Sequence, residues 1–228
     1  MFYSIEQAES LCENDPSLIF NLIDCGEKDV LLKIINKSDF NFNILNSNND
    51  NIVMYLLKNK YYDLVLKYID KVDINHQNND GDTIMHILVG CKYVNVKEII
   101  EYVLNNKDIC LNTKNNNGET ILDKSINTNY LYTTVKILEN ANFNSIDIYS
   151  FKKLYDTYVK SNNYGKYSKL SNLELIIDAI KNKKLIPRMR KLIYLIVNNK
   201  KEIEKDLNYS KTDNLDYIIN RVVQESID

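Results

Sequence analysis

Polar, glycine-containing turns alternate with apolar segments of helical period in this sequence, and the alternation recurs. Residues 78–86 read Asn-Asn-Asp-Gly-Asp-Thr-Ile-Met-His, and residues 115–122 read Asn-Asn-Asn-Gly-Glu-Thr-Ile-Leu, so the pattern returns 37 positions later. Two apolar stripes with helical spacing follow the first turn: Ile84, Met85, Leu88 and Val89, and then Val96, Ile99, Ile100, Val103 and Leu104. One unit is therefore predicted to hold a turn, two helices and an extended exit. Recurrence at this distance predicts a repeat-built binding protein.

The chemistry of the turn predicts how the first helix of a unit begins. Gly81 accepts a positive φ, and the aspartate before it favours a turn. Thr83 is the predicted N-cap, with its hydroxyl accepting the His86 backbone N–H and the imidazole bonding back toward Thr83, as in a capping box. His86 is therefore assigned a structural role, because no nucleophile and orienting partner accompany it. His76 is expected to be exposed.

The motif in residues 80–86 resembles the ankyrin-repeat signature with one turn residue missing. Further copies align with it: Gly26–Ile35 is similar to the second helix of that repeat, Val72–Asn75 is similar to its Ala-Asp-Val-Asn exit, and Asn49 stands 32 residues before Gly81. Spacings of 32 and 37 bracket the roughly 33 residues of an ankyrin repeat. The resemblance implies an all-α ankyrin-repeat solenoid of helix-turn-helix repeats with hairpin fingers. Its degenerate, Asn- and Tyr-rich repeats are most similar to ankyrin proteins of giant DNA viruses of the mimivirus type.

The copies depart from regular ankyrin repeats at closely packed positions. Only the third copy keeps the histidine, and no copy keeps the proline. The small alanine pair of the first helix is replaced by Leu22-Ile23, Leu56-Leu57, Leu88-Val89 and Ser125-Ile126. Bulkier residues at these positions predict a changed helix spacing or curvature.

Three segments are predicted along the chain. Residues 1–16 are expected to form an N-terminal cap. Its short helix would start with Ser4 and Gln7 as a capping box and end near Glu13, before a break at residues 14–16; a short linear binding motif is the alternative. Residues 17–145 hold four ankyrin repeats, at about 17–45, 46–77, 78–114 and 115–145. Residues 146–228 lose the signature but keep helical periodicity, with one helix starting at Pro187 and a last one over 215–223. They are expected to form a helical C-terminal cap, with a fifth degenerate repeat or an independent domain as alternatives.

Length, composition and charge restrict the class of protein. The chain has 228 residues with 44% hydrophobic content, enough for a substantial core. Its net charge of −2 gives no global field that favours nucleic acid. No apolar run approaches the ~20 residues that span a bilayer, and the N-terminus lacks the features of a signal peptide. A soluble, monomeric protein of the cytoplasm is expected, with the nucleus as an alternative.

No catalytic residue, cofactor or metal site is predicted. The cysteines are far apart and are expected to be free thiols rather than zinc ligands; they are Cys12, Cys25, Cys91 and Cys110. Asp73, Asp80 and Asp82 lack the register of an EF-hand loop. The sequence contains no Gly-rich phosphate loop and no defensible arrangement of catalytic side chains. Most tyrosines, such as Tyr68 and Tyr102, are expected in the core.

The resemblance implies a non-catalytic protein-protein interaction module or adaptor, whose unknown partner lies across the fingers and the concave face. Transferred to this chain, the partner-binding positions are Asp24, Cys25, Asp50, Lys58, Asn59, Lys71, Asn79, Asp80, Asp82, Gly90, Cys91, Asn106, Asn116, Asn117, Glu119, Asn127, Thr128 and Asn140. The structural motif comprises Gly81, Thr83, His86, Gly118 and Thr120.

Two other functions are alternatives. One is a substrate-recruiting subunit of a ubiquitin ligase, which would need an F-box-like motif that residues 146–228 do not display. The other is binding of nucleic acid or an acidic surface by the basic segment 181–205, which predicts affinity that falls steeply with salt. Apolar residues such as Leu192 and Ile196 interleave that segment, so a solvated helix face is favoured there.

Overall fold

The computed structural model describes residues 5–91, 96–140, 143, 146–161, 166–181, 183, 185, 187–198, 201, 216–217 and 219–220. The chain divides into two compact units, Met1–Ile121 and Leu122–Asp228, which are described separately. Across the described residues the regular elements are helices, and β-pairing is limited to two isolated bridges, Leu45–Asn51 and Lys114–Thr120. The expected all-α class is therefore observed.

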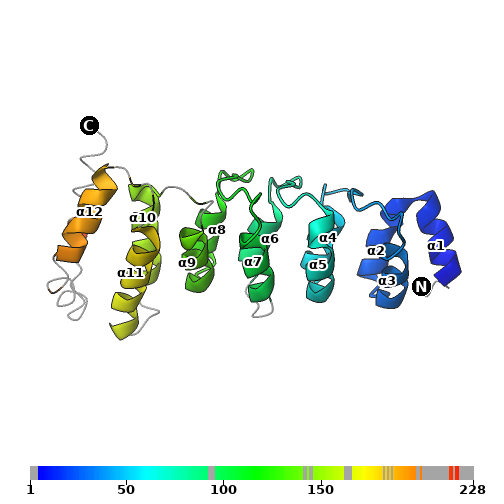
Figure 1. Ribbon diagram of the computed structural model, residues 1–228, viewed down its shortest axis with the longest axis horizontal. Coiled ribbons are helices and arrows are strands. Elements are labelled where there is room, and N and C mark those ends of the chain that lie inside the picture. Colours follow the sequence, from blue (N-terminus) through cyan, green and yellow to red (C-terminus); the bar gives the residue numbers. More distant parts are fainter. Residues whose placement is uncertain are drawn as a thin grey trace. The chain divides into compact units, whose positions relative to one another are not determined.

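Helix pairs follow one another in unit 1 (Figure 1). A first helix, α1 (Ile5–Asn14), and a 3₁₀ turn, η1 (Pro16–Leu18), precede them. The pairs are α2 (Ile19–Asp24) with α3 (Lys28–Ile35), α4 (Ile52–Lys58) with α5 (Tyr62–Tyr68), and α6 (Ile84–Gly90) with α7 (Lys97–Leu104); η2 (Ile69–Lys71) extends the second pair. The helices of each pair pack on each other, and α4 also packs on α2 and α6. Each pair thus buries its apolar faces against its neighbours, as stacked repeats require.

The core of unit 1 is built from the predicted apolar stripes. The large residues that replace the alanine pair are buried, including Leu22, Leu56 and Leu88. Tyr68 is buried as expected, whereas the expectation for Tyr102 is wrong because its side chain is 43% exposed. Tyr102 lies outside the buried stripe of α7, and its hydroxyl donates to a carboxylate oxygen of Asp70 at 2.6 Å.

Unit 2 is also helical. It contains all but the first residue of α8 (Ile121–Asn127), then α9 (Leu131–Glu139) and α10 (Ile148–Tyr155), which a π-helical turn, η4 (Asp156–Lys160), continues. α11 (Lys166–Ile180) and α12 (Pro187–Asn198) follow. Pro187 begins α12, as predicted. α11 packs on α9 and η4. The predicted capping contact of Ser4 and most of the last predicted helix, residues 215–223, lie outside the described residues.

A polar cluster crosses the core of unit 2. Ser125, which replaces an alanine of the repeat, lies 3.1 Å from Thr134, oxygen to oxygen, and the Thr134 hydroxyl lies 2.8 Å from that of Tyr158. Asn172 of α11 donates its amide to the Tyr158 carbonyl at 3.0 Å. All four residues are buried, so these bonds satisfy polar groups that would otherwise destabilise the core.

Candidate protein-interaction surface

The predicted capping box at the start of α6 is confirmed. His86 donates its backbone N–H to the Thr83 hydroxyl, and Nδ1 of His86 accepts the Thr83 backbone N–H at 3.2 Å. The remaining ring nitrogen, Nε2, therefore carries the proton and lies 3.2 Å from the carbonyl oxygen of Glu119. His86 is fully buried. Both imidazole nitrogens are thus engaged in holding one turn to its helix and to the next turn, which is a structural role.

Three turns of unit 1 share one backbone conformation; finger 1 comprises residues 46–50, finger 2 residues 78–82 and finger 3 residues 115–119. Gly81 and Gly118 have φ values of +72° and +74°, and Asn49 adopts +59° at the equivalent position, as the alignment predicted. Glycine or asparagine is needed there because other side chains rarely adopt this region. In each finger the first backbone N–H donates to the carbonyl of the last residue, which closes the turn.

An asparagine at the first position organises each finger from inside. In finger 2 the side-chain oxygen of Asn78 accepts the backbone N–H groups of Asp80 and Asp82, each at 3.0 Å. Asn46 and Asn115 make the same pair of bonds in fingers 1 and 3. Since the asparagine replaces water as the acceptor for these groups, each finger is held in one shape.

Hydrogen bonds also run between successive fingers, and we name this set the asparagine ladder. Each later finger donates to the one before it: the Asn79 backbone N–H to the Asn48 carbonyl, and the Asn116 backbone N–H to the Asp80 carbonyl, both at 2.9 Å. The amides of the first-position asparagines donate to carboxylates at the last position of the preceding finger, Asn78 to Asp50 at 2.8 Å and Asn115 to Asp82 at 2.9 Å. The ladder fixes the spacing of the three fingers.

Asp50 requires a correction. Asp50 was expected on the binding surface, but it is 0% exposed. Its carboxylate accepts Lys58 Nζ at 2.6 and 2.8 Å, and it also receives the Asn78 amide. A buried carboxylate must be paired in this way, so Asp50 stabilises the ladder instead of facing a partner. The exposure expected for His76 is also wrong, because the ring is half-buried and Nε2 lies 2.7 Å from the Asn49 carbonyl oxygen.

The remaining predicted contact residues divide by exposure. The exposed ones are Asp24, Cys25, Lys58, Asn59, Lys71, Asn79, Asp80, Gly90, Asn116, Asn117 and Asn127. The half-buried ones are Asp82, Cys91, Asn106, Glu119, Thr128 and Asn140. Fingers 2 and 3 bring six of them together, whereas Asn127, Thr128 and Asn140 belong to unit 2.

The exposed finger residues fall into two groups. The side-chain amides of Asn79 and Asn116 belong to the ladder, because they donate to the carbonyls of Ser47 and Asn79 respectively. The side chains of Asn48, Asp80 and Asn117 take no part in the ladder and are exposed. These three side chains, one from each finger, form what we name the finger-tip set. The sequence contained a signal for it, because an asparagine recurs four residues before Asp50, Asp82 and Glu119.

Several cations of the basic segment are used by unit 2 itself. Lys183 donates to the Asn140 carbonyl, and burial holds the pKa of its ammonium below the usual value. Lys181 pairs with Asp178 at 3.1 Å, and Arg190 donates Nε to the Leu185 carbonyl at 3.0 Å. The side chains of Lys184, Arg188, Lys200 and Lys205 lie outside the described residues.

Two further kinds of feature are absent from the part of the chain that the structure describes. No cluster of three or more His, Cys, Asp or Glu side chains there has the proximity that a metal ion needs. None of the helices in the described ranges is long and apolar enough to cross a bilayer.

Known proteins include a relative of this chain. No protein-family model matches the chain. A protein of Acanthamoeba polyphaga mimivirus that is described as an ankyrin repeat protein is 27% identical over 175 residues, which are 72% of this chain and 22% of the relative. This chain thus spans about a fifth of the length of that relative. The predicted likeness to viral ankyrin-repeat proteins is confirmed, and the helix pairs form an ankyrin-repeat-like fold.

Proposed function

We propose that this chain binds a partner protein, without catalysis, through the finger-tip set of unit 1 together with the neighbouring exposed positions Asn79 and Asn116. The chain would act as a monomeric adaptor in the cytoplasm, and its ligand would be a protein and not a nucleic acid.

The observation that supports this proposal is that some finger side chains bond to neighbouring fingers while others remain exposed. Buried and half-buried polar groups, such as Asp50, Asn78 and Asn115, are satisfied by the ladder. The tips Asn48, Asp80 and Asn117 keep their side chains in solvent. A surface whose backbone is ordered before binding loses little conformational entropy when a partner arrives. Exposed amides and one carboxylate on such a scaffold can recognise polar and basic groups of a protein surface.

Affinity capture with a finger-tip variant tests the proposal. The full chain would be immobilised, and bound proteins from a host-cell lysate would be quantified by mass spectrometry. The variant Asn48→Ala, Asp80→Ala and Asn117→Ala removes the tips without removing a side chain of the ladder. We expect at least about a tenfold loss of the specific partner, which corresponds to about 1.4 kcal/mol.

A charge-matched control comes from exposed residues on the second helices of the pairs. Asp29→Ala and Glu98→Ala each raise the net charge by one and Lys33→Ala lowers it by one, so this variant changes the net charge by +1, as Asp80→Ala does alone. Its capture of the partner should equal that of the unmodified chain. Equal capture by the finger-tip variant would overturn the proposal, provided that its circular dichroism spectrum is unchanged.

A further inference from the structure

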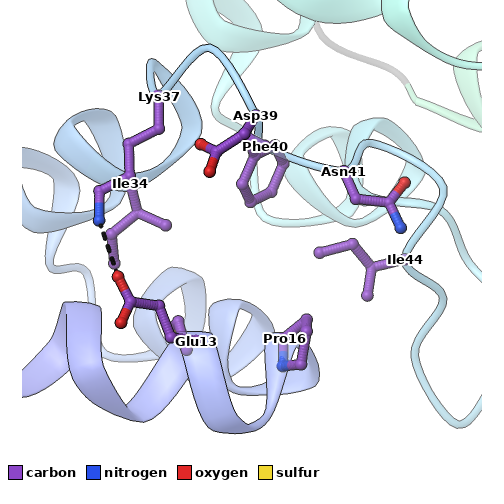
Figure 2. A pocket seen from close by; sticks show the side chains of 9 residues that line it. Glu13, Pro16, Ile34, Lys37, Asp39, Phe40, Asn41 and Ile44 are labelled. Atoms are coloured by element: carbon purple, nitrogen blue, oxygen red, sulfur yellow. Dashed lines mark hydrogen bonds and ion pairs between the residues drawn. The ribbon is translucent and has the colours of Figure 1, made fainter.

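A pocket opens at the start of unit 1, outside the finger-tip set. It lies between the end of α1, Pro16 of η1, α3 and the loop that follows α3, and its volume is about 190 Å³. Figure 2 shows Asp39 and Phe40 entering it from the loop, with Glu13 and Pro16 on the opposite wall. Small-molecule sites usually occupy about 300–1,000 Å³, so this pocket suits a single side chain better than a cofactor.

The pocket lies where a finger is missing. Finger 2 precedes α6 and finger 3 precedes α8, and each of these fingers donates hydrogen bonds to the finger before it. Before α2, residues 14–18 instead complete α1 and form the turn η1, which Asp15 caps by accepting the Ser17 N–H at 3.0 Å. Finger 1 therefore has no preceding finger among the described residues, and the segment leading into it borders a cavity.

The sequence at this border differs from that of the later repeats. Ile44 stands 32 positions before His76, whose ring bonds to the Asn49 carbonyl of the preceding finger. An apolar residue thus occupies a position that is polar where a preceding finger exists. Together with Pro16 and Phe40 it gives the pocket an apolar lining.

The charges around this lining are predominantly negative. Glu13 and Asp39 contribute two carboxylates, against one ammonium from Lys37. Lys37 Nζ lies 3.4 Å from Glu13 Oε1, as Figure 2 shows. Asp39 is exposed and has no hydrogen-bond or ion-pair partner among the described residues. An unpaired carboxylate beside an aromatic ring and apolar walls complements a side chain with an apolar stem and a cationic head.

We infer that this pocket receives a basic side chain, arginine in preference to lysine, from an extended segment of a partner protein. The aliphatic stem would contact Pro16 and Ile44, and the cationic head would pair with Asp39 over the ring of Phe40. Arginine is preferred because its planar guanidinium bonds a carboxylate through two N–H groups and stacks on aromatic rings. The site extends recognition beyond the finger-tip set and does not depend on it.

Titration of the ¹⁵N-labelled chain with blocked tripeptides, followed by NMR, tests this inference. The probes are acetyl-Gly-Arg-Gly-amide and the same peptide with Lys, Gln or Glu at its centre. We expect the Arg peptide to shift the backbone amides of residues 39–44, the Lys peptide to bind several-fold more weakly, and the Gln and Glu peptides to cause no saturable shift. Raising the salt concentration should lower the affinity for the Arg peptide, because the ion pair between its arginine and Asp39 would be exposed to solvent.

Two variants of equal charge change provide the control. Asp39→Asn keeps the shape of the pocket and should lower the affinity for the Arg peptide at least about tenfold. Asp29→Asn, on the exposed part of α3, should leave that affinity unchanged. Equal binding of the Gln peptide, unchanged affinity in Asp39→Asn, or shifts confined to other residues would each overturn the inference. Finger-tip variants should bind the Arg peptide normally, so this inference and the proposed function can fail separately.

Discussion

Replacing Gly81 by alanine is expected to destabilise the chain more than the same replacement at Gly118, although the two glycines have nearly the same φ, +72° and +74°. A non-glycine residue in the left-handed region costs about 1–2 kcal/mol at either position. A Cβ at Gly81 would lie 2.7 Å from both the backbone nitrogen and the side-chain oxygen of Asn116. A Cβ at Gly118 would meet no atom within 4 Å.

The extra cost at Gly81 follows from the ladder. To avoid the new methyl group, finger 3 must shift, and this weakens the bonds from Asn116 to the carbonyls of Asp80 and Asn79, now 2.9 and 2.7 Å long. Each such bond contributes about 0.5–1.5 kcal/mol. We therefore expect the free energy of unfolding to fall by about 2–5 kcal/mol in Gly81→Ala and by about 1–2 kcal/mol in Gly118→Ala.

Urea unfolding followed by far-ultraviolet circular dichroism and by tyrosine fluorescence measures these losses. The comparison requires coincident transitions by the two probes and a common slope, because repeat arrays can unfold in stages. Gly26→Ala is a second control, since its nearest heavy atom, the Tyr61 hydroxyl oxygen, would be 3.9 Å from the Cβ. Equal losses at all three glycines would refute the argument that finger 3 packs against Gly81.

Other parts of the structure give three further predictions. Asp50→Ala should cost about 2–4 kcal/mol in urea unfolding, because it leaves the buried Asn78 amide without an acceptor and breaks an ion pair; a change below about 0.5 kcal/mol would contradict this. The Tyr55 hydroxyl donates to Asp24 at 2.7 Å, which raises its pKa to about 12. The bond should therefore stabilise the folded chain below the ordinary tyrosine pKa of 10.0, and this stabilisation should be lost as the pH rises through 12. A spectrophotometric titration of Tyr55→Phe should lack one phenol that ionises near pH 12, and an unchanged titration curve in that range would contradict the bond. Burial raises the pKa of the Cys12 thiol, so it should react with a thiol reagent more slowly than the exposed cysteines in the folded chain and equally fast in urea; equal rates in the folded chain would contradict its burial.

Sequence patterns predicted the features that depend on neighbours along the chain. The helix pairs follow from apolar residues at helical spacing, and the Thr83–His86 capping box joins residues only three positions apart. The positive φ of Gly81 and Asn49 follows from turn chemistry and alignment. Such local rules hold because the interacting groups are brought together by the element itself.

Features that join distant parts of the chain were not predictable in the same way. Asp50 resembles an exposed loop aspartate in sequence, and its burial depends on an amide from Asn78 in the next finger. Tyr102 resembles a core aromatic residue, yet the buried stripe of α7 leaves it in solvent beside Asp70. The pocket beside Phe40 lies where the end of α1 and η1 stand in the place of a finger. A pattern within a single repeat does not predict this difference between repeats.

The direction of the asparagine ladder bears on how genes for such chains can change. Asn78 and Asn115 each read a carboxylate of the preceding turn, Asp50 and Asp82. Because these junctions use equivalent groups, recombination that duplicates or deletes one whole repeat joins a compatible donor to a compatible acceptor. A crossover within a repeat would instead join mismatched halves, so selection would retain insertions and losses in steps of one complete unit.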